Sequence, residues 1–67
     1  MKLYELKPNT KFKLLENVEG PPDAHKPNKD EEYLFKHLDG MYSLCYDMKN
    51  RVIHIVGWAE VEELKES

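Results

Sequence analysis

Hydrophobic and polar residues alternate early in this chain in the way expected of a strand that is buried on one face. Within residues 11–15, Phe12 and Leu14 fall on one face, whereas Lys11 and Lys13 fall on the other. The pattern predicts a first strand here, with Phe12 and Leu14 in the core.

Three further apolar stretches predict strands over residues 32–38, 41–46 and 51–57. Asp39-Gly40 separates the first two, and Lys49-Asn50 separates the last two. Asp-Gly between apolar runs is the strongest short-range hairpin signal, because glycine accepts the positive φ that tight turns require. We therefore expect these strands to form an antiparallel meander.

The register of the first hairpin has two alternatives, because a slip of one residue moves every side chain to the opposite face. A two-residue turn at Asp39-Gly40 places one set of side chains on a common face: Tyr33, Phe35, His37, Tyr42, Leu44 and Tyr46. A three-residue loop over residues 38–40, with Gly40 in a bulge, changes the partners on that face. It places Tyr33, Phe35 and His37 on a common face with Met41, Ser43 and Cys45.

We favour the bulged loop, because cysteine and methionine are frequently buried whereas tyrosine tolerates partial exposure. This register predicts a core that includes Phe35, Met41, Cys45, Ile53 and Ile55. It predicts a second, outward face that carries Tyr42, Leu44 and Tyr46.

The remaining segments are short or polar. Residues 3–6 predict a short cap, and residues 60–64 predict either a fifth strand beside the first or one helical turn. We favour the strand, in which Val61 points inward and closes a barrel. Residues 17–31 are polar and contain three prolines, which indicates one long surface loop that is flexible or disordered. Residues 65–67 are expected to fray.

The composition allows one small domain. A chain of 67 residues with 40% hydrophobic residues can form a single core, so residues 1–67 are predicted to be one mainly β, five-stranded antiparallel barrel. Cys45 is the only cysteine, which excludes an intrachain disulfide and favours a reducing, cytoplasmic setting. The longest apolar run, residues 52–58, is far shorter than the roughly 18 residues of a membrane span.

The net charge of −3 and the presence of a single arginine, Arg51, disfavour nucleic acid as the main partner. Single-stranded nucleic acid would require the basic residues to gather on one face of the barrel, where they could flank stacked bases. These residues are Lys11, Lys13, Lys36, Lys49 and Arg51.

Several segments together resemble small phage-encoded proteins of uncharacterised function. Four of them are residues 39–45, residues 52–55, Trp58 and residues 60–62. The fifth is the opening strand, residues 6–12, in which a leucine is followed by a proline or glycine and then by Lys-Phe. The resemblance excludes residues 17–31, where this chain is longer. It implies a small SH3-like barrel from a phage or prophage, located in the host cytoplasm, and it carries over no catalytic or binding residue.

Candidate catalytic and metal-binding chemistry is sparse. The strong metal ligands are His25, His37, His54 and Cys45, and their spacing matches no zinc motif, although Asp23-Ala24-His25 offers a weak loop site. Cys45 lacks the electropositive neighbours of a reactive thiolate, so we interpret it as a buried hydrophobe. The carboxylates of residues 30–32 and 60–63 are interpreted as solvated, and the three isolated glycines form no phosphate loop. We predict no enzyme, metal or cofactor.

The aromatic residues form the best candidate site, because tyrosine and tryptophan are enriched at protein interfaces. The candidate residues are Tyr42, Tyr46, Trp58 and His37, with core packing as the alternative for Trp58. The leading hypothesis is a non-enzymatic binding module, a phage accessory protein that engages a host or phage protein. Single-stranded nucleic-acid binding and homo-oligomerisation through an exposed edge strand are the alternatives.

Overall fold

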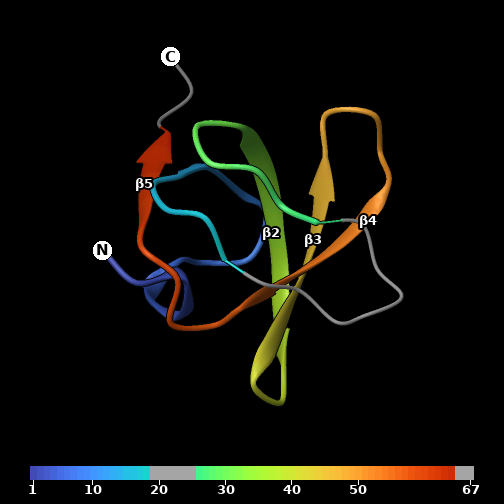
Figure 1. Ribbon diagram of the computed structural model, residues 1–67. Coiled ribbons are helices and arrows are strands. Elements are labelled where there is room, and N and C mark those ends of the chain that lie inside the picture. Colours follow the sequence, from blue (N-terminus) through green and yellow to red (C-terminus); the bar gives the residue numbers. More distant parts are fainter. Residues whose placement is uncertain (19–25, 65–67) are drawn as a thin grey trace.

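The computed structural model describes residues 1–18 and 26–64, which form one curled antiparallel sheet (Figure 1). Within these residues the sheet has five strands in the order β4-β3-β2-β1-β5. The strands are β1 (Thr10–Leu14), β2 (Glu32–Asp39), β3 (Tyr42–Asp47), β4 (Val52–Val56) and β5 (Val61–Leu64), and a 3-10 helix, η1, spans Leu3–Glu5. The mainly β prediction is confirmed. β4 and β5 are the two edges of the sheet, so the hydrogen-bonded ladder does not close into a barrel.

Strand β1 shows the predicted alternation. Phe12 and Leu14 have no exposed surface, whereas Lys11 and Lys13 lie on the other face and are half-buried. β1 pairs with β2 on one side and with β5 on the other, where Leu14 lies opposite Val61. Val61 is buried in the core, so the prediction of an inward-pointing fifth strand beside the first is confirmed.

The turn between β2 and β3 differs from both predicted alternatives. Asp39 pairs with Tyr42, which leaves Gly40 and Met41 as a two-residue turn, and Gly40 has a φ of +65°. A positive φ at the first central residue only is the pattern of a type II′ hairpin turn, in which glycine is preferred. The predicted three-residue loop is therefore wrong. Met41 is 57% exposed at the tip of the hairpin and does not belong to the core.

A β-bulge at Lys36 divides the β2–β3 pairing into two registers. Phe35 pairs with Cys45, but the next paired residue, His37, lies opposite Leu44. Before the bulge Phe35 and Cys45 face inward together, as the bulged-loop alternative predicts. After the bulge His37 shares the outer face with Leu44, as the two-residue-turn alternative predicts. Each alternative thus assigns the faces correctly on one side of Lys36, whereas neither gives the observed residue pairs.

The turn between β3 and β4 is organised by the carboxylate of Asp47. Its Oδ1 accepts hydrogen bonds from the backbone N–H groups of Lys49 at 2.9 Å and Arg51 at 2.8 Å. Its Oδ2 accepts a hydrogen bond from the Nε–H of Arg51 at 2.7 Å. Asn50, with a φ of +63°, completes the loop, and left-handed backbone is tolerated better by asparagine than by most residues. Asp47 is thereby a buried acid whose oxygens are all bonded.

These bonds make the turn sensitive to acid. The backbone N–H of Arg51, followed by its guanidinium, lowers the pKa of Asp47 below the ordinary value of 3.8. A carboxylate with a lowered pKa stabilises the fold above its ordinary pKa, and this contribution is lost as pH falls through the folded-state pKa. We expect Asp47→Asn to lower the urea midpoint at neutral pH, and the difference from wild type to shrink as pH falls below 3.8.

The control for this experiment is Asp39→Asn, which makes the same charge change at an exposed residue of β2. Its effect on the neutral-pH midpoint should be smaller. A difference between wild type and Asp47→Asn that stays constant from neutral to acid pH would contradict the assigned role of the carboxylate.

Both described ends of the long polar loop are anchored. Val18 packs against the core and Pro27 is buried. The N–H of Asp30 donates to the carbonyl of Leu14 at 2.7 Å, and the N–H of Asn28 donates to the hydroxyl of Tyr33 at 2.9 Å. Residues 17–18 and 26–31 lie outside helices and strands, as expected of a loop, and the flexibility of residues 17–31 stays a prediction. Residues 19–25, with His25, and the tail 65–67 lie outside the described residues.

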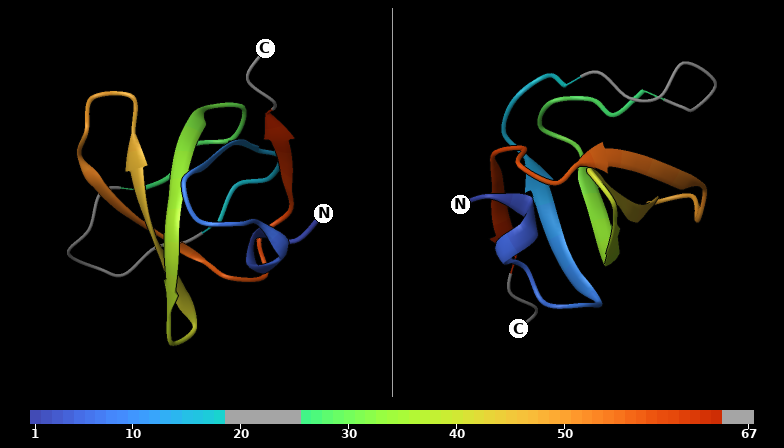
Figure 2. Two further views of the ribbon diagram at one scale, coloured as in Figure 1. Left: turned by 180° about the vertical axis from the view of Figure 1, so that it is seen from behind. Right: turned by 90° about the horizontal axis from the view of Figure 1, so that it is seen from below.

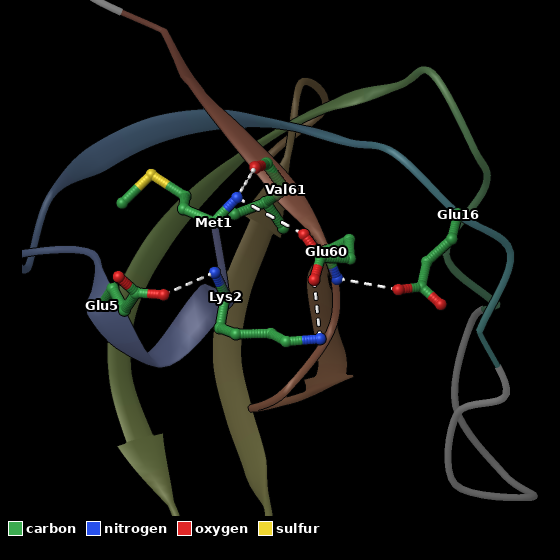
Figure 3. A network of polar contacts seen from close by, with 6 residues as sticks. All are labelled: Met1, Lys2, Glu5, Glu16, Glu60 and Val61. Carbon is green, nitrogen blue, oxygen red and sulfur yellow. Dashed lines mark hydrogen bonds and ion pairs between the residues drawn. The ribbon is translucent and has the colours of Figure 1, made fainter.

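The N-terminal segment forms the predicted cap and covers the start of β5 (Figure 3). Leu3 and Leu6 are buried, and the N–H of Val61 donates to the carbonyl of Met1 at 2.8 Å. Lys2 Nζ lies 2.6 Å from Glu60 Oε1. Figure 2 shows η1 beside β5, at the rim of the sheet opposite to β4.

Candidate functional site

The outer face of the β2–β3–β4 meander carries the residues that a binding surface would use. Antiparallel partners point to the same face, so the ladder defines three cross-strand rows on this side. The rows are Leu34–Tyr46–Val52, His37–Leu44–His54 and Asp39–Tyr42–Val56. All nine residues are half-buried or exposed. The face, which we call the outer face, is therefore mostly apolar and accessible.

The structure brings together three of the four predicted site residues. Tyr42 and Tyr46 are half-buried on β3, and His37 is exposed on β2 in the row between them. The bulge at Lys36 places His37 there, because without it the alternation of β2 would turn His37 to the same side as Phe35.

Trp58 lies apart from these rows. It follows β4 in the turn of residues 56–59, where the N–H of Ala59 donates to the carbonyl of Val56 at 3.1 Å. Its side chain is 52% exposed, so it does not pack in the core. The neighbouring backbone bond, from the N–H of Tyr4 to the carbonyl of Gly57, places exposed Tyr4 beside this turn.

Lysine side chains border the outer face. Nζ of Lys36 lies 5.9 Å from the centre of the Tyr46 ring, within the range of a cation–π contact. Lys11 and Lys13 pair with Leu34 and Glu32 and therefore point to the same side of the sheet. Arg51 and Lys49 lie in the β3–β4 turn, where Arg51 is bound to Asp47.

Cys45 faces the opposite, buried side of the sheet. Its side chain has no exposed surface, and burial raises the pKa of its thiol to about 11. Ser43 Oγ lies 3.3 Å from Cys45 Sγ and donates to the carbonyl of Ile55 at 2.7 Å. The interpretation of Cys45 as a buried hydrophobe is confirmed.

The acidic residues predicted to be solvated divide into two groups. Glu60 is bonded to Lys2 and to the N-terminal ammonium, which lower the pKa of its carboxyl. Asp30, Glu31 and Glu32 are exposed at the start of β2, as are Glu62 and Glu63 on β5. Within residues 1–18 and 26–64, no group of three or more His, Cys, Asp or Glu side chains is arranged to hold a metal ion.

Sequence reasoning missed four members of the outer face: Leu34, Asp39, Val52 and Val56. The alternation of β4 carries the missing signal, since Ile53 and Ile55 were assigned to the core and their neighbours must then point outward. Among the described residues, no helix is long and apolar enough to cross a membrane. Comparison of the chain with models of protein families, with curated proteins and with solved structures finds no match.

Proposed function

We propose that this protein is a non-enzymatic binding module that engages a protein partner through the outer face. The observation that carries the proposal is the set of three cross-strand rows, in which Tyr42, Leu44 and Tyr46 lie together on the same half-buried to exposed face of the sheet. Half-buried tyrosines offer a partner large apolar area together with a polar hydroxyl.

The finer parts of the proposal concern fold type and origin. In the sheet, β5 lies on one side of β1 and the meander β2–β3–β4 lies on the other side. This strand order supports an SH3-like barrel that is open between β4 and β5. Two residues of the long loop support this, since the partly buried Val18 packs against the core and Pro27 is buried. We further propose, from the sequence resemblance, that the protein is a phage accessory protein and that its partner is a host or phage protein.

The test is affinity capture with wild type and with the double variant Tyr42→Ala/Tyr46→Ala. Because both tyrosines lie on the outer face, the double variant should lose at least about tenfold of the recovered partner, as expected when two interface anchors are truncated. The measurement is quantitative mass spectrometry of the recovered proteins, followed by binding of the purified partner to each variant.

Tyr4→Ala is the matched control, because Tyr4 is an exposed tyrosine on η1 that belongs to none of the three rows. It should recover the same partner as wild type. Equal recovery by wild type and the double variant would refute the outer face as the binding surface.

Single-stranded nucleic-acid binding is a second candidate, favoured by one observation. Lys11, Lys13 and Lys36 lie beside the outer face, on the side of the sheet that carries Tyr42 and Tyr46, an arrangement that suits stacked bases flanked by phosphates. Glu32 and Glu62, however, lie on either side of Lys13 in the ladder. Oligonucleotide binding that weakens as salt rises, and that is lost in Lys36→Glu, would favour this candidate over a protein partner.

A further inference from the structure

Strand β4 is an edge strand with no charged side chain. Its sequence is Val52-Ile53-His54-Ile55-Val56, and among the described strands it pairs with β3 alone. Edge strands present unpaired N–H and C=O groups, which proteins usually protect with charges, prolines or a covering segment. Within the part of the chain that the structure describes, β4 has no charged residue and no proline, and at its last residue the carbonyl of Val56 accepts the N–H of Ala59.

The direction of the unpaired groups follows from the ladder. The N–H of Gly57 donates to Met41, and the N–H of Asp47 donates to Arg51, so these two pairs are hydrogen-bonded pairs. Such pairs alternate with non-bonded pairs along an antiparallel ladder. Because the β3–β4 register is continuous, Ile53 and Ile55 bond to β3, and the N–H groups of Val52, His54 and Val56 point to the open edge.

The other edge of the sheet differs in each respect. Met1 pairs with Val61 along the outside of β5, and Lys2 forms a bridge with Glu60 (Figure 3). The rest of β5 carries Glu62 and Glu63, both exposed, whose like charges would oppose the approach of another strand. Among the described strands, β4 therefore offers an uncharged edge that is open at Val52 and His54.

The sequence of β4 reads the same in both directions around His54. A second copy placed antiparallel across a two-fold axis at His54 would pair His54 with its own copy and Val52 with Val56. These are the residues whose backbone groups point to the edge, so register and hydrogen bonding agree. Ile53 and Ile55 would meet on the core side, and no residue pair would bring like formal charges together at neutral pH.

We propose that this protein forms a two-fold symmetric dimer in which β4 pairs with β4 of a second copy, centred on His54. A two-fold contact of this kind is closed, so it ends at two copies and does not extend into a filament. The dimer joins the two sheets and makes the outer faces of both copies continuous. It goes beyond the proposed function, because a monomer could bind a partner through the same face.

The first test is hydrogen exchange measured residue by residue by NMR at rising concentrations of wild-type protein. The N–H groups of Val52, His54 and Val56 should become protected, with exchange slowed by about tenfold or more, as expected for newly buried hydrogen bonds. Those of Ile53 and Ile55 should change little, because they already bond to β3. Over the same range the mass in solution should rise from 8.0 kDa to twice that value.

The second test compares two lysine substitutions by mass in solution. His54→Lys would place two lysines opposite each other at the axis, so this variant should stay monomeric at concentrations where wild type is dimeric. Met48→Lys adds the same charge to the exposed tip of the same hairpin and should dimerise like wild type. If His54→Lys does not fold by circular dichroism, Val52→Lys, at a 44% exposed residue of the same edge, replaces it.

Three outcomes would overturn the proposal. Wild type that keeps a mass of 8.0 kDa at every concentration has no such dimer. A dimer in which exchange at Val52, His54 and Val56 does not depend on concentration uses a different surface. A folded His54→Lys variant that dimerises as well as Met48→Lys excludes His54 from the axis.

Discussion

Replacing Phe12 with alanine is expected to lower the free energy of unfolding by about 3–5 kcal/mol, the usual cost of truncating a buried phenylalanine. Phe12 has no exposed surface, and the centre of its ring lies 5.8 Å from that of Tyr33. It lies on β1, which pairs with both β2 and β5, so the cavity would open where the two halves of the sheet meet.

The loss would be severe in a chain of this size. At roughly 0.05–0.15 kcal/mol per residue, small domains have a total stability comparable to the expected loss. Urea unfolding followed by circular dichroism would measure it, and a substantial unfolded population without urea is the expected result. Tyr4→Ala, at a 55% exposed residue, is the control and should change stability by about 0.5 kcal/mol or less. Equal unfolding midpoints for the two variants would contradict the assigned core.

Cys45 is expected to react with an alkylating reagent at least about 100-fold more slowly in the folded protein than in the unfolded chain at neutral pH. The thiolate is the reactive form, and burial raises the pKa of this thiol from 9.0 to about 11, which reduces the thiolate population by about a factor of 100. The lack of exposed surface slows the reaction further.

Alkylation rates with and without urea, followed by intact mass, would measure this protection. A variant with Cys45→Ala and Met48→Cys carries one thiol at an exposed position and is the control for reagent access. It should react at a similar rate in both conditions. Reaction of native Cys45 as fast as the control thiol would show that the inner face of β3 opens readily.

Much of the core could be predicted from the sequence, because period-two alternation is a local property. The alternation around Phe12 and Leu14 identified the inward face of β1 correctly. The single apolar residue Val61 between glutamates was sufficient to orient β5. In both cases the side chains on the buried face are apolar and those on the other face are mostly charged, so only one orientation buries apolar area.

The register of the β2–β3 hairpin could not be predicted, because two features changed it in opposite directions. The central residues of the turn are Gly40 and Met41, so Asp39 pairs with Tyr42. A turn centred on Asp39-Gly40 would instead pair Leu38 with Met41. The bulge at Lys36 then restores the face of Phe35. Lysine carries no sequence signal for a bulge, so the bulge could not be predicted. The predicted register was wrong, although it placed Phe35 and Cys45 correctly on the inward face.

The candidate site was only partly accessible from sequence for the same reason. Tyr42 and Tyr46 were assigned to the outward face, where the structure places them. His37 joins them through the bulge, and Trp58 lies in a turn that strand periodicity does not describe. Edge position and the direction of free backbone groups depend on the order of strands, which is a long-range property.

The strand order also has a consequence for how the chain folds. The pairs β2–β3 and β3–β4 join neighbouring segments, whereas β1–β5 joins residues near the two ends of the chain, such as Lys11 and Leu64. Closing that large loop costs more chain entropy than closing a hairpin. Local contacts therefore favour early formation of the meander and late docking of β5. A chain that folds in this order presents the palindromic edge of β4 before its core is complete.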